Sequence, residues 1–363
     1  MLFTCTPFRV SMNSEPEVLF ERRGAAGIIT LNRPQALNAF TFPAVRAIRS
    51  RLKEWATEPE VSRVIIQANG KAFAAGGDIR TLVEQLKDGR LEEAMAFFRE
   101  EYSLNYEIKR YPKPYVALVD GICMGGGVGL SVHGSFRVAG DRYLFAMPEV
   151  SIGFFPDVGA TYFLPRLPGR IGTYLALTAA RFGPGEGVGF GLATHRVPSS
   201  RFPVLIEALS GGADVSGTLA AFSTRPEPNS LAGREGVIDR AFAGESVEAV
   251  LDNLQREGQR GGEDATFANT QAAAIRTKSP TSLKIALEQM HRGSTLDFAE
   301  CMRTEFRIVS RVARGHDFFE GVRAVVVDKD NAPKWKPATI EGVTDRAVAA
   351  YFEPLGPGED LPL

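Results

Sequence analysis

Ala75-Gly76-Gly77-Asp78 and Met124-Gly125-Gly126-Gly127-Val128-Gly129 are glycine turns, each standing where a strand-like run gives way to a helix-like run. The first turn of a helix leaves main-chain N–H groups without partners, and these groups attract negative charge. Two such turns from distant parts of one chain could hold a single carbonyl oxygen from two sides. The pair therefore predicts an α/β protein with a site for an acyl group.

Acidic residues follow the second glycine turn. Glu149 comes after Pro148 and Asp157 after Pro156, within a stretch rich in apolar and aromatic residues. Such acids are either solvent-facing turn residues or partly buried groups with a raised pKa. Glu101, in a predicted helix, is either a solvated charge or a third acid that faces the same cleft. Because two acids frame an apolar run, we favour proton or nucleophile chemistry on the activated carbon.

Other motifs with glycine turns or nucleophiles do not fit this sequence. A dinucleotide fingerprint needs Gly-x-Gly-x-x-Gly, but the sixth position is Leu130 counted from Gly125 and Val132 counted from Gly127. Ser131 does not stand in a Gly-x-Ser-x-Gly nucleophile motif. Close backbone packing at a tight turn remains the alternative explanation of the glycines. If the site is catalytic, its chemistry rests on carboxylates and backbone donors.

Composition narrows the class of protein. The 363 residues carry a net charge of −1 and are 44 % hydrophobic, which suits a large globular domain with an appendage, or two domains. The charge balance gives no reason to expect a nucleic acid partner. No apolar run approaches the ~18 residues that a membrane span needs. The three cysteines and four histidines are scattered without metal or disulfide spacing, so we expect no bound metal.

The first thirteen residues contain one arginine, several hydroxyl residues and no acid. They are compatible with a degenerate organellar leader, and Met12 is an alternative start of the chain. We expect a cytoplasmic location, with the mitochondrial matrix as the alternative if the segment is a leader.

Strand-like and helix-like patterns alternate along the first half of the chain, which indicates an α/β fold with crossover connections. Asp78 is expected to cap a helix, and a second helix is expected to run from the glycines at 125–127 through His133. These patterns suit a solenoid-like spiral or a doubly wound sheet. Further strands are expected at 18–20, 28–31, 63–68, 115–119, 136–139 and 143–146, and further helices at 42–55, 91–109, from Ser279-Pro280 to Gly293, and from Phe298.

Several long motifs resemble one family. They are Asn32–Ala39, Lys71–Ile79, Gly125–Gly127, Phe98–Tyr102, Tyr115–Leu118, Val128–Gly134, Phe154–Gly159, Arg314–Phe318, Glu320–Ala324, Lys329–Asp330 and Pro333–Pro337. On these residues the chain resembles the crotonase (enoyl-CoA hydratase/isomerase) superfamily and, within it, the 3-hydroxyisobutyryl-CoA hydrolase branch. The likeness covers residues 16–353.

The resemblance implies a fold and a division of the chain. It implies a crotonase-like spiral of ββα turns with two stacked sheets and a helical C-terminal region. We expect a disordered or extended segment at 1–15, the spiral core with a CoA-thioester site at 16–225, and the helical region at 226–363. Crotonase relatives often form trimers or paired trimers, so a homo-oligomer is also expected.

The same resemblance implies roles for individual residues. Gly77 and Gly126 match the two backbone donors of an oxyanion hole, and Glu149 matches an acid shared with hydratases. The second acid of hydratases falls at Gly129 here. Asp157 and Glu101 match the substrate site of the hydrolase branch. The remaining substrate-binding positions are Gln35, Ala36, Leu37, Ala75 and Asp78.

We therefore expect hydrolysis of a β-hydroxyacyl-CoA thioester, with 3-hydroxyisobutyryl-CoA of valine breakdown as the implied substrate. Glu149 either attacks as a nucleophile or activates water, and Asp157 either holds the β-hydroxyl or passes a proton to the departing thiolate. Neither route needs a metal or redox cofactor, because CoA is part of the substrate. One alternative is an enoyl-CoA hydratase or isomerase that works with Glu149 alone. Another is a scaffold that binds acyl-CoA without turnover.

Overall fold

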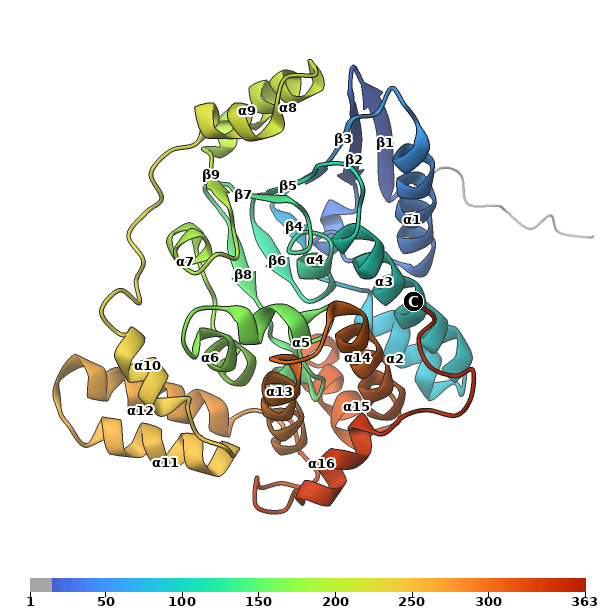
Figure 1. Ribbon diagram of the computed structural model, residues 1–363. Helices are drawn as coiled ribbons and strands as arrows, with labels where there is room; N and C mark the ends of the chain where they lie inside the picture. The colour runs from blue at the N-terminus through green and yellow to red at the C-terminus, as the bar shows by residue number, and fades with distance from the viewer. Residues whose placement is uncertain (1–14) are drawn as a thin grey trace, which may run out of the picture.

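The computed structural model describes residues 15–363. The alternative leader, the alternative start at Met12 and all but the last residue of the expected disordered or extended segment at 1–15 therefore lie outside the described residues. Two sheets form the centre of the molecule (Figure 1). In the larger sheet the strand order is β1-β2-β3-β5-β7-β9, and all neighbours are parallel except the β1–β2 hairpin. Its strands are β1 (Val18–Arg23), β2 (Ala26–Leu31), β3 (Arg63–Ala68), β5 (Tyr115–Val119), β7 (Phe136–Ala139) and β9 (His195–Arg196). The smaller, parallel sheet contains β4 (Ala72–Ala74), β6 (Ile122–Met124) and β8 (Leu144–Ala146).

Successive strands alternate between the two sheets. β3, β5 and β7 join the larger sheet, and β4, β6 and β8, which follow each of them, join the smaller one. Each pair of strands is therefore one layer of a spiral, which selects the spiral over the doubly wound sheet. Strands β3 and β5 are buried nearly throughout, as expected for parallel strands that are covered on both faces.

Helices connect the layers and cover the sheets (Figure 1). Asp78 caps α2 by accepting a hydrogen bond from the Thr81 N–H, as the sequence predicts. The helix expected through His133 is wrong in length, because α4 ends at Gly129. Glycine is a weak helix former, and the Ser131 hydroxyl donates to carbonyls inside this turn. Helices in the first half are α1 (Phe42–Thr57), α2 (Ile79–Lys87), α3 (Leu91–Lys109), α4 (Gly126–Gly129), α5 (Ala160–Phe163), α6 (Ile171–Thr178), α7 (Pro184–Gly189), α8 (Phe202–Ser210) and α9 (Val215–Phe222).

An extended stretch after α9 leads to the second group of helices (Figure 1). Helices α10, α11 and α12 pack together, whereas α13 and α14 return to the core and contact α6 and α3. The division near residue 226 stays a prediction, and one apolar core contains residues from both sides of it. These helices are α10 (Glu235–Ala241), α11 (Val247–Gly258), α12 (Gly262–Arg276), α13 (Pro280–Gly293), α14 (Phe298–Val312), α15 (His316–Val322) and α16 (Asp345–Phe352). Short turns are η1 (Pro34–Ala36), η2 (Glu149–Ile152), η3 (Leu164–Arg166), η4 (Ser199–Arg201) and the π-helical η5 (Arg323–Val327).

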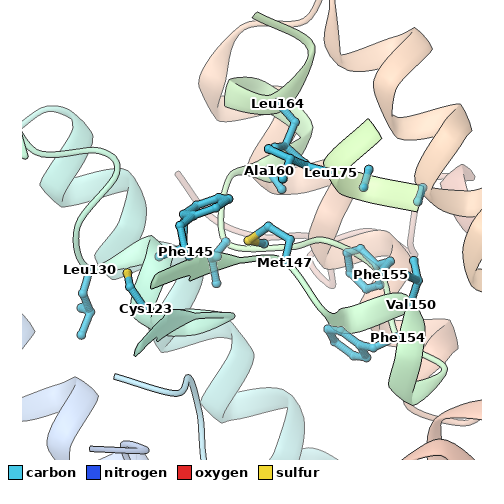
Figure 2. Packing of buried hydrophobic residues seen from close by; sticks show 14 of the residues in the cluster. Cys123, Leu130, Phe145, Met147, Val150, Phe154, Phe155, Ala160, Leu164 and Leu175 are labelled. Carbon is cyan, nitrogen blue, oxygen red and sulfur yellow. The ribbon is translucent and has the colours of Figure 1, made fainter. Parts of the chain in front are cut away.

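The apolar core continues beneath the segment that carries Glu149 and Asp157. Phe145 and Met147 end the third layer, and Phe154 and Phe155 stack on one another with ring centroids 4.7 Å apart (Figure 2). All four side chains are buried. This packing fixes the chain on either side of Glu149 and just before Asp157. Among residues 15–363, no helix is both long and apolar enough to span a bilayer.

The layer contact between α4 and β4 depends on Gly127. A Cβ at this position would lie 2.9 Å from the Ala74 Cβ and would also press on the Ala74 carbonyl. We expect Gly127→Ala to lower the free energy of unfolding by about 1–3 kcal/mol, as overpacking does. The control is Gly236→Ala on an exposed face of α10, where alanine should stabilise the helix by about 0.5–1 kcal/mol. Urea unfolding measures both variants, and similar effects in the two would contradict this interpretation.

Candidate active site

A cavity of about 80 Å³ lies where the two glycine turns, α3 and the segment after β8 meet. It contains the predicted oxyanion-hole glycines and all three predicted acids. Its remaining walls are apolar or glycine. The lining residues are Ala75, Gly76, Gly77, Ile79, Phe97, Phe98, Glu101, Gly125, Gly126, Pro148, Glu149, Ile152, Phe154 and Asp157.

The two glycine turns lie directly against each other at this cavity. A Cβ at Gly76 would lie 3.1 Å from the Gly126 nitrogen, and a Cβ at Gly126 would lie 3.3 Å from the Gly77 nitrogen. Gly76 and Gly125 have φ values of 106° and 51°, which favour glycine. In the described part of the chain, the N–H groups of Gly77 and Gly126 form no hydrogen bond with another protein group. These N–H groups can therefore be offered to a ligand oxygen.

The three acids approach the cavity from different elements. Glu149 is the first residue of η2, Asp157 follows Pro156 in the loop before α5, and Glu101 lies in the middle of α3. Each has 5 % or less of its surface exposed. Asp157 Oδ2 accepts a hydrogen bond of 2.8 Å from the Tyr102 hydroxyl. Within residues 15–363, Glu149 Oε2 and Glu101 Oε1 are buried and have no hydrogen-bond partner, so both are available to a bound molecule.

Burial raises the proton affinity of these acids. The pKa values of Glu101 and Glu149 lie well above the usual range because of burial first and the charge of Asp157 second. Burial also raises the pKa of Asp157 to about 7, although the hydrogen bond from Tyr102 opposes this rise. Asp157 can therefore accept or donate a proton near neutral pH, as a catalytic carboxyl group must.

The predicted CoA-binding residues are only partly at the cavity. Ala75 lines it, and its N–H donates to the Leu37 carbonyl, 3.0 Å away. Gln35, Ala36 and Leu37 belong to η1 and its end and are not among the lining residues. Asp78 also lies outside this cavity, because its carboxylate is held by Arg33 at 2.8 Å and caps α2. It lines a neighbouring pocket of about 410 Å³ instead.

Gly129 stands where hydratases have their second acid, and the side chain of Asn105 occupies the space beside it. A Cβ at Gly129 would lie 2.5 Å from Asn105 Nδ2 on α3. The side chain of Asn105 is completely buried, and neither polar atom has a partner in the described residues. Gly126 and Gly129 lie on the same face of α4. Because neither has a side chain, this face leaves room for the side chains of Glu101 and Asn105, which lie one turn apart on α3.

Two buried residues near Asp157 were not identified from the sequence as site residues. Tyr102 follows Glu101 in a quoted motif but was given no role. Glu305 interrupts the apolar face of the helix that begins at Phe298, and its carboxylate accepts hydrogen bonds from the chain just after Asp157. An acid on an otherwise apolar helix face was a signal that could have identified it.

The comparisons agree with this fold and site. The family model described as enoyl-CoA hydratase/isomerase matches residues 26–352. Two solved structures cover 96 % of the chain: a carnitinyl-CoA dehydratase from Mycobacterium thermoresistibile (38 % identity, TM-score 0.89, 99 % of that chain) and an enoyl-CoA hydratase from Rhodobacter sphaeroides 2.4.1 (39 %, 0.88, 100 %). The chain therefore belongs to the enoyl-CoA hydratase/isomerase family, and the predicted crotonase-like fold is confirmed.

The chain is more similar in sequence to a hydrolase of this family than to these two solved structures. It is 48 % identical over 360 residues to the mitochondrial 3-hydroxyisobutyryl-CoA hydrolase of Rattus norvegicus, and this alignment covers 96 % of the chain and 92 % of the relative. The predicted resemblance to the hydrolase branch is confirmed by this likeness.

The raised pKa of Asp157 makes a prediction about stability. Between its unperturbed pKa of 3.8 and about 7, the carboxyl group keeps its proton in the folded state and loses it when the chain unfolds. The folded state then binds more protons, so this group lowers stability as the pH rises. The side chain of the Asp157→Asn variant cannot ionise. Its free energy of unfolding at pH 8 should therefore be about 1–2 kcal/mol higher than that of the wild type.

This difference should shrink as the pH falls towards 4, which urea unfolding at several pH values would measure. The control is Asp297→Asn at the exposed N-cap of α14, which should follow the wild type at every pH. An Asp157→Asn variant that is less stable than the wild type at pH 8 would contradict the prediction.

Proposed function

We propose that this protein hydrolyses 3-hydroxyisobutyryl-CoA to 3-hydroxyisobutyrate and CoA, a reaction of valine breakdown. The observation that carries the proposal is the meeting of two unused main-chain N–H groups and two buried acids at one small cavity. The 48 % identity to a hydrolase of this name supports the choice of substrate.

The geometry suits attack on a thioester. Attack on the carbonyl carbon places negative charge on its oxygen, and the N–H groups of Gly77 and Gly126 are positioned to receive it. One such donor is typically worth about 3–4 kcal/mol of barrier. Glu149, whose Oε2 has no protein partner, either attacks the carbon or removes a proton from water. Asp157, protonated over part of the neutral pH range, either holds the β-hydroxyl or supplies a proton to the thiolate.

A hydratase or isomerase is the alternative, and the two similar solved structures, a carnitinyl-CoA dehydratase and an enoyl-CoA hydratase, support the hydratase. A hydratase that used an acid pair would need a second carboxyl group near Glu149. Position 129 is a glycine, and the buried amide of Asn105 occupies the space beside it. The acid pair that matches hydratases is therefore incomplete, whereas Asp157, which matches the hydrolase branch, lines the cavity beside Glu149.

The remaining attributes are also proposals. The reaction is proposed to need no cofactor beyond the CoA of the substrate, and the protein to form a homo-oligomer. The relative's name places that protein in mitochondria, which supports the alternative of a mitochondrial leader. No finding supports the cytoplasmic location, which stays a prediction.

One assay separates the three functions. We expect incubation with 3-hydroxyisobutyryl-CoA to release free thiol, measured with a thiol reagent, and incubation with crotonyl-CoA to leave the enoyl absorbance unchanged. Loss of enoyl absorbance without thiol release would instead identify a hydratase. A protein that leaves both thioesters intact would be a binding scaffold.

The two acids can be tested separately. Glu149→Gln and Asp157→Asn should each lower kcat at least tenfold, because each removes a group that exchanges a proton or attacks the carbon. Circular dichroism and urea unfolding should show that both variants fold. Asp297→Asn, the same change at an exposed helix cap, should keep kcat within twofold. Near-normal turnover in the Glu149 or Asp157 variant would remove that residue from the mechanism.

A further inference from the structure

The turn that presents Asp157 has an unfavourable backbone. Val158, the next residue, has a φ of 51°, and Gly159 has a φ of 92°. The left-handed region is rare for a β-branched residue, because its side chain crowds the main chain there. A conformation of this kind persists only when the surroundings hold it, and such positions cluster at functional sites.

Helix α14 holds this turn through Glu305. Its Oε2 accepts a hydrogen bond of 2.7 Å from the Gly159 N–H, and its Oε1 accepts one of 2.9 Å from the Thr161 N–H. The Glu305 side chain is completely buried. In residues 15–363 it forms no ion pair with a lysine, arginine or histidine. Burying a carboxyl group without a cation is costly unless it is hydrogen-bonded, and both oxygens of Glu305 spend their hydrogen bonds on this turn.

Helix α13 holds the same turn through Gln289. Its amide Nε2 donates to the Pro156 carbonyl at 2.9 Å and to the Thr161 hydroxyl at 2.7 Å, and this side chain is also completely buried. His133 Nε2 forms a third contact, 2.7 Å long, with the Val158 carbonyl. The chain on both sides of Asp157 is thus fixed by side chains that are distant in sequence.

We infer that Glu305 and Gln289 are positioning residues for Asp157: they hold residues 156–161 in a strained turn that aims the Asp157 carboxyl at the Tyr102 hydroxyl and into the cavity. This inference rests on the proposed function only in making Asp157 the catalytic partner. It makes the C-terminal helices part of the active site, although none of their residues lines the cavity.

Glu305→Gln is a fitting change because it keeps the shape of the side chain. Burial, together with the charge of Asp157, raises the pKa of Glu305 to about 8, so the substitution removes little charge at pH 7. The amide retains one acceptor oxygen and turns its NH₂ group towards the other main-chain N–H. One of the two contacts is therefore lost, and the turn loosens.

A double-mutant cycle tests whether Glu305 acts through Asp157. In the wild-type background, Glu305→Gln should lower kcat for 3-hydroxyisobutyryl-CoA at least fivefold and leave KM within twofold. In the Asp157→Asn background, the same change should lower kcat less than twofold, because the group that it positions is already disabled. An equal loss in both backgrounds, or no loss in the wild type, would overturn the inference.

Glu186→Gln is the matched control. Glu186 is a buried acid that also accepts two main-chain hydrogen bonds, from the Gly183 and Ser230 N–H groups, but it lies on α7 outside the cavity. Its variant should lose thermal stability and keep kcat within twofold in both backgrounds. If Glu305→Gln does not fold, Gln289→Met replaces it, with the same expected result and the same overturning results.

Urea unfolding of the four proteins of the cycle separates this inference from the proposed function, because it needs no substrate. Non-additive changes in the midpoint at pH 8 are expected if residue 305 fixes the position of residue 157. Non-additive midpoints in a protein that releases no thiol would reject the hydrolase and keep the positioning role. Additive midpoints in an active enzyme would reject the positioning role and keep the hydrolase.

Discussion

The contact between the two glycine turns is the constraint on which the rest of this molecule depends. A Cβ on Gly76 would lie 3.1 Å from the Gly126 nitrogen, and a Cβ on Gly126 would lie 3.3 Å from the Gly77 nitrogen and would collide with Glu101 and Phe40. This approach brings two main-chain N–H groups from separate layers of the spiral to one point. The spiral supplies the approach, because β4 and β6 are neighbours in the smaller sheet and each ends at a glycine turn. This pair of unbonded N–H groups, the proposed oxyanion site, is thus a direct product of the layered fold.

Three carboxyl groups line the cavity at that point, and a fourth, that of Glu305, holds the turn after Asp157, all in an environment that resists their charge. Glu101, Glu149, Asp157 and Glu305 are all buried, and burial raises the pKa of each. Ionising one makes ionising the next harder, so the group exchanges protons as a unit. Such a cluster destabilises the fold. Phe98 and Phe154 line the cavity, Phe98 stacks on Phe154 with ring centroids 5.8 Å apart, and Phe154 stacks on Phe155 (Figure 2).

The sequence predicted most of the elements and the centre of the site. The strands at 63–68 and 115–119 were predicted accurately because a short apolar run is typical of a strand that is buried on both faces. Asp78 was identified as a cap because apolar residues recur at helical spacing after it. The length of α4 was wrong, because a serine hydroxyl competes for its carbonyls and this local chemistry has no periodic pattern. Tyr102 and Glu305 were not identified as site residues because their hydrogen bonds join residues that are 55 and 146 positions apart in the sequence. A one-dimensional pattern does not report which distant helix meets a given turn.

The two completely buried side chains that α13 and α14 place on the turn have a consequence for how this protein can be divided. A chain truncated after the sheets would retain every residue that lines the cavity and the His133 contact, yet the loop ahead of α5 would lose the hydrogen bonds of Gln289 and Glu305 that hold its left-handed conformation. The spiral and the C-terminal helices are accordingly inseparable for chemistry, whatever their independence as folding units. Substitutions in either part must preserve the hydrogen bonds to the other part. Grafting only the residues that line the cavity onto another protein would therefore not transfer the activity.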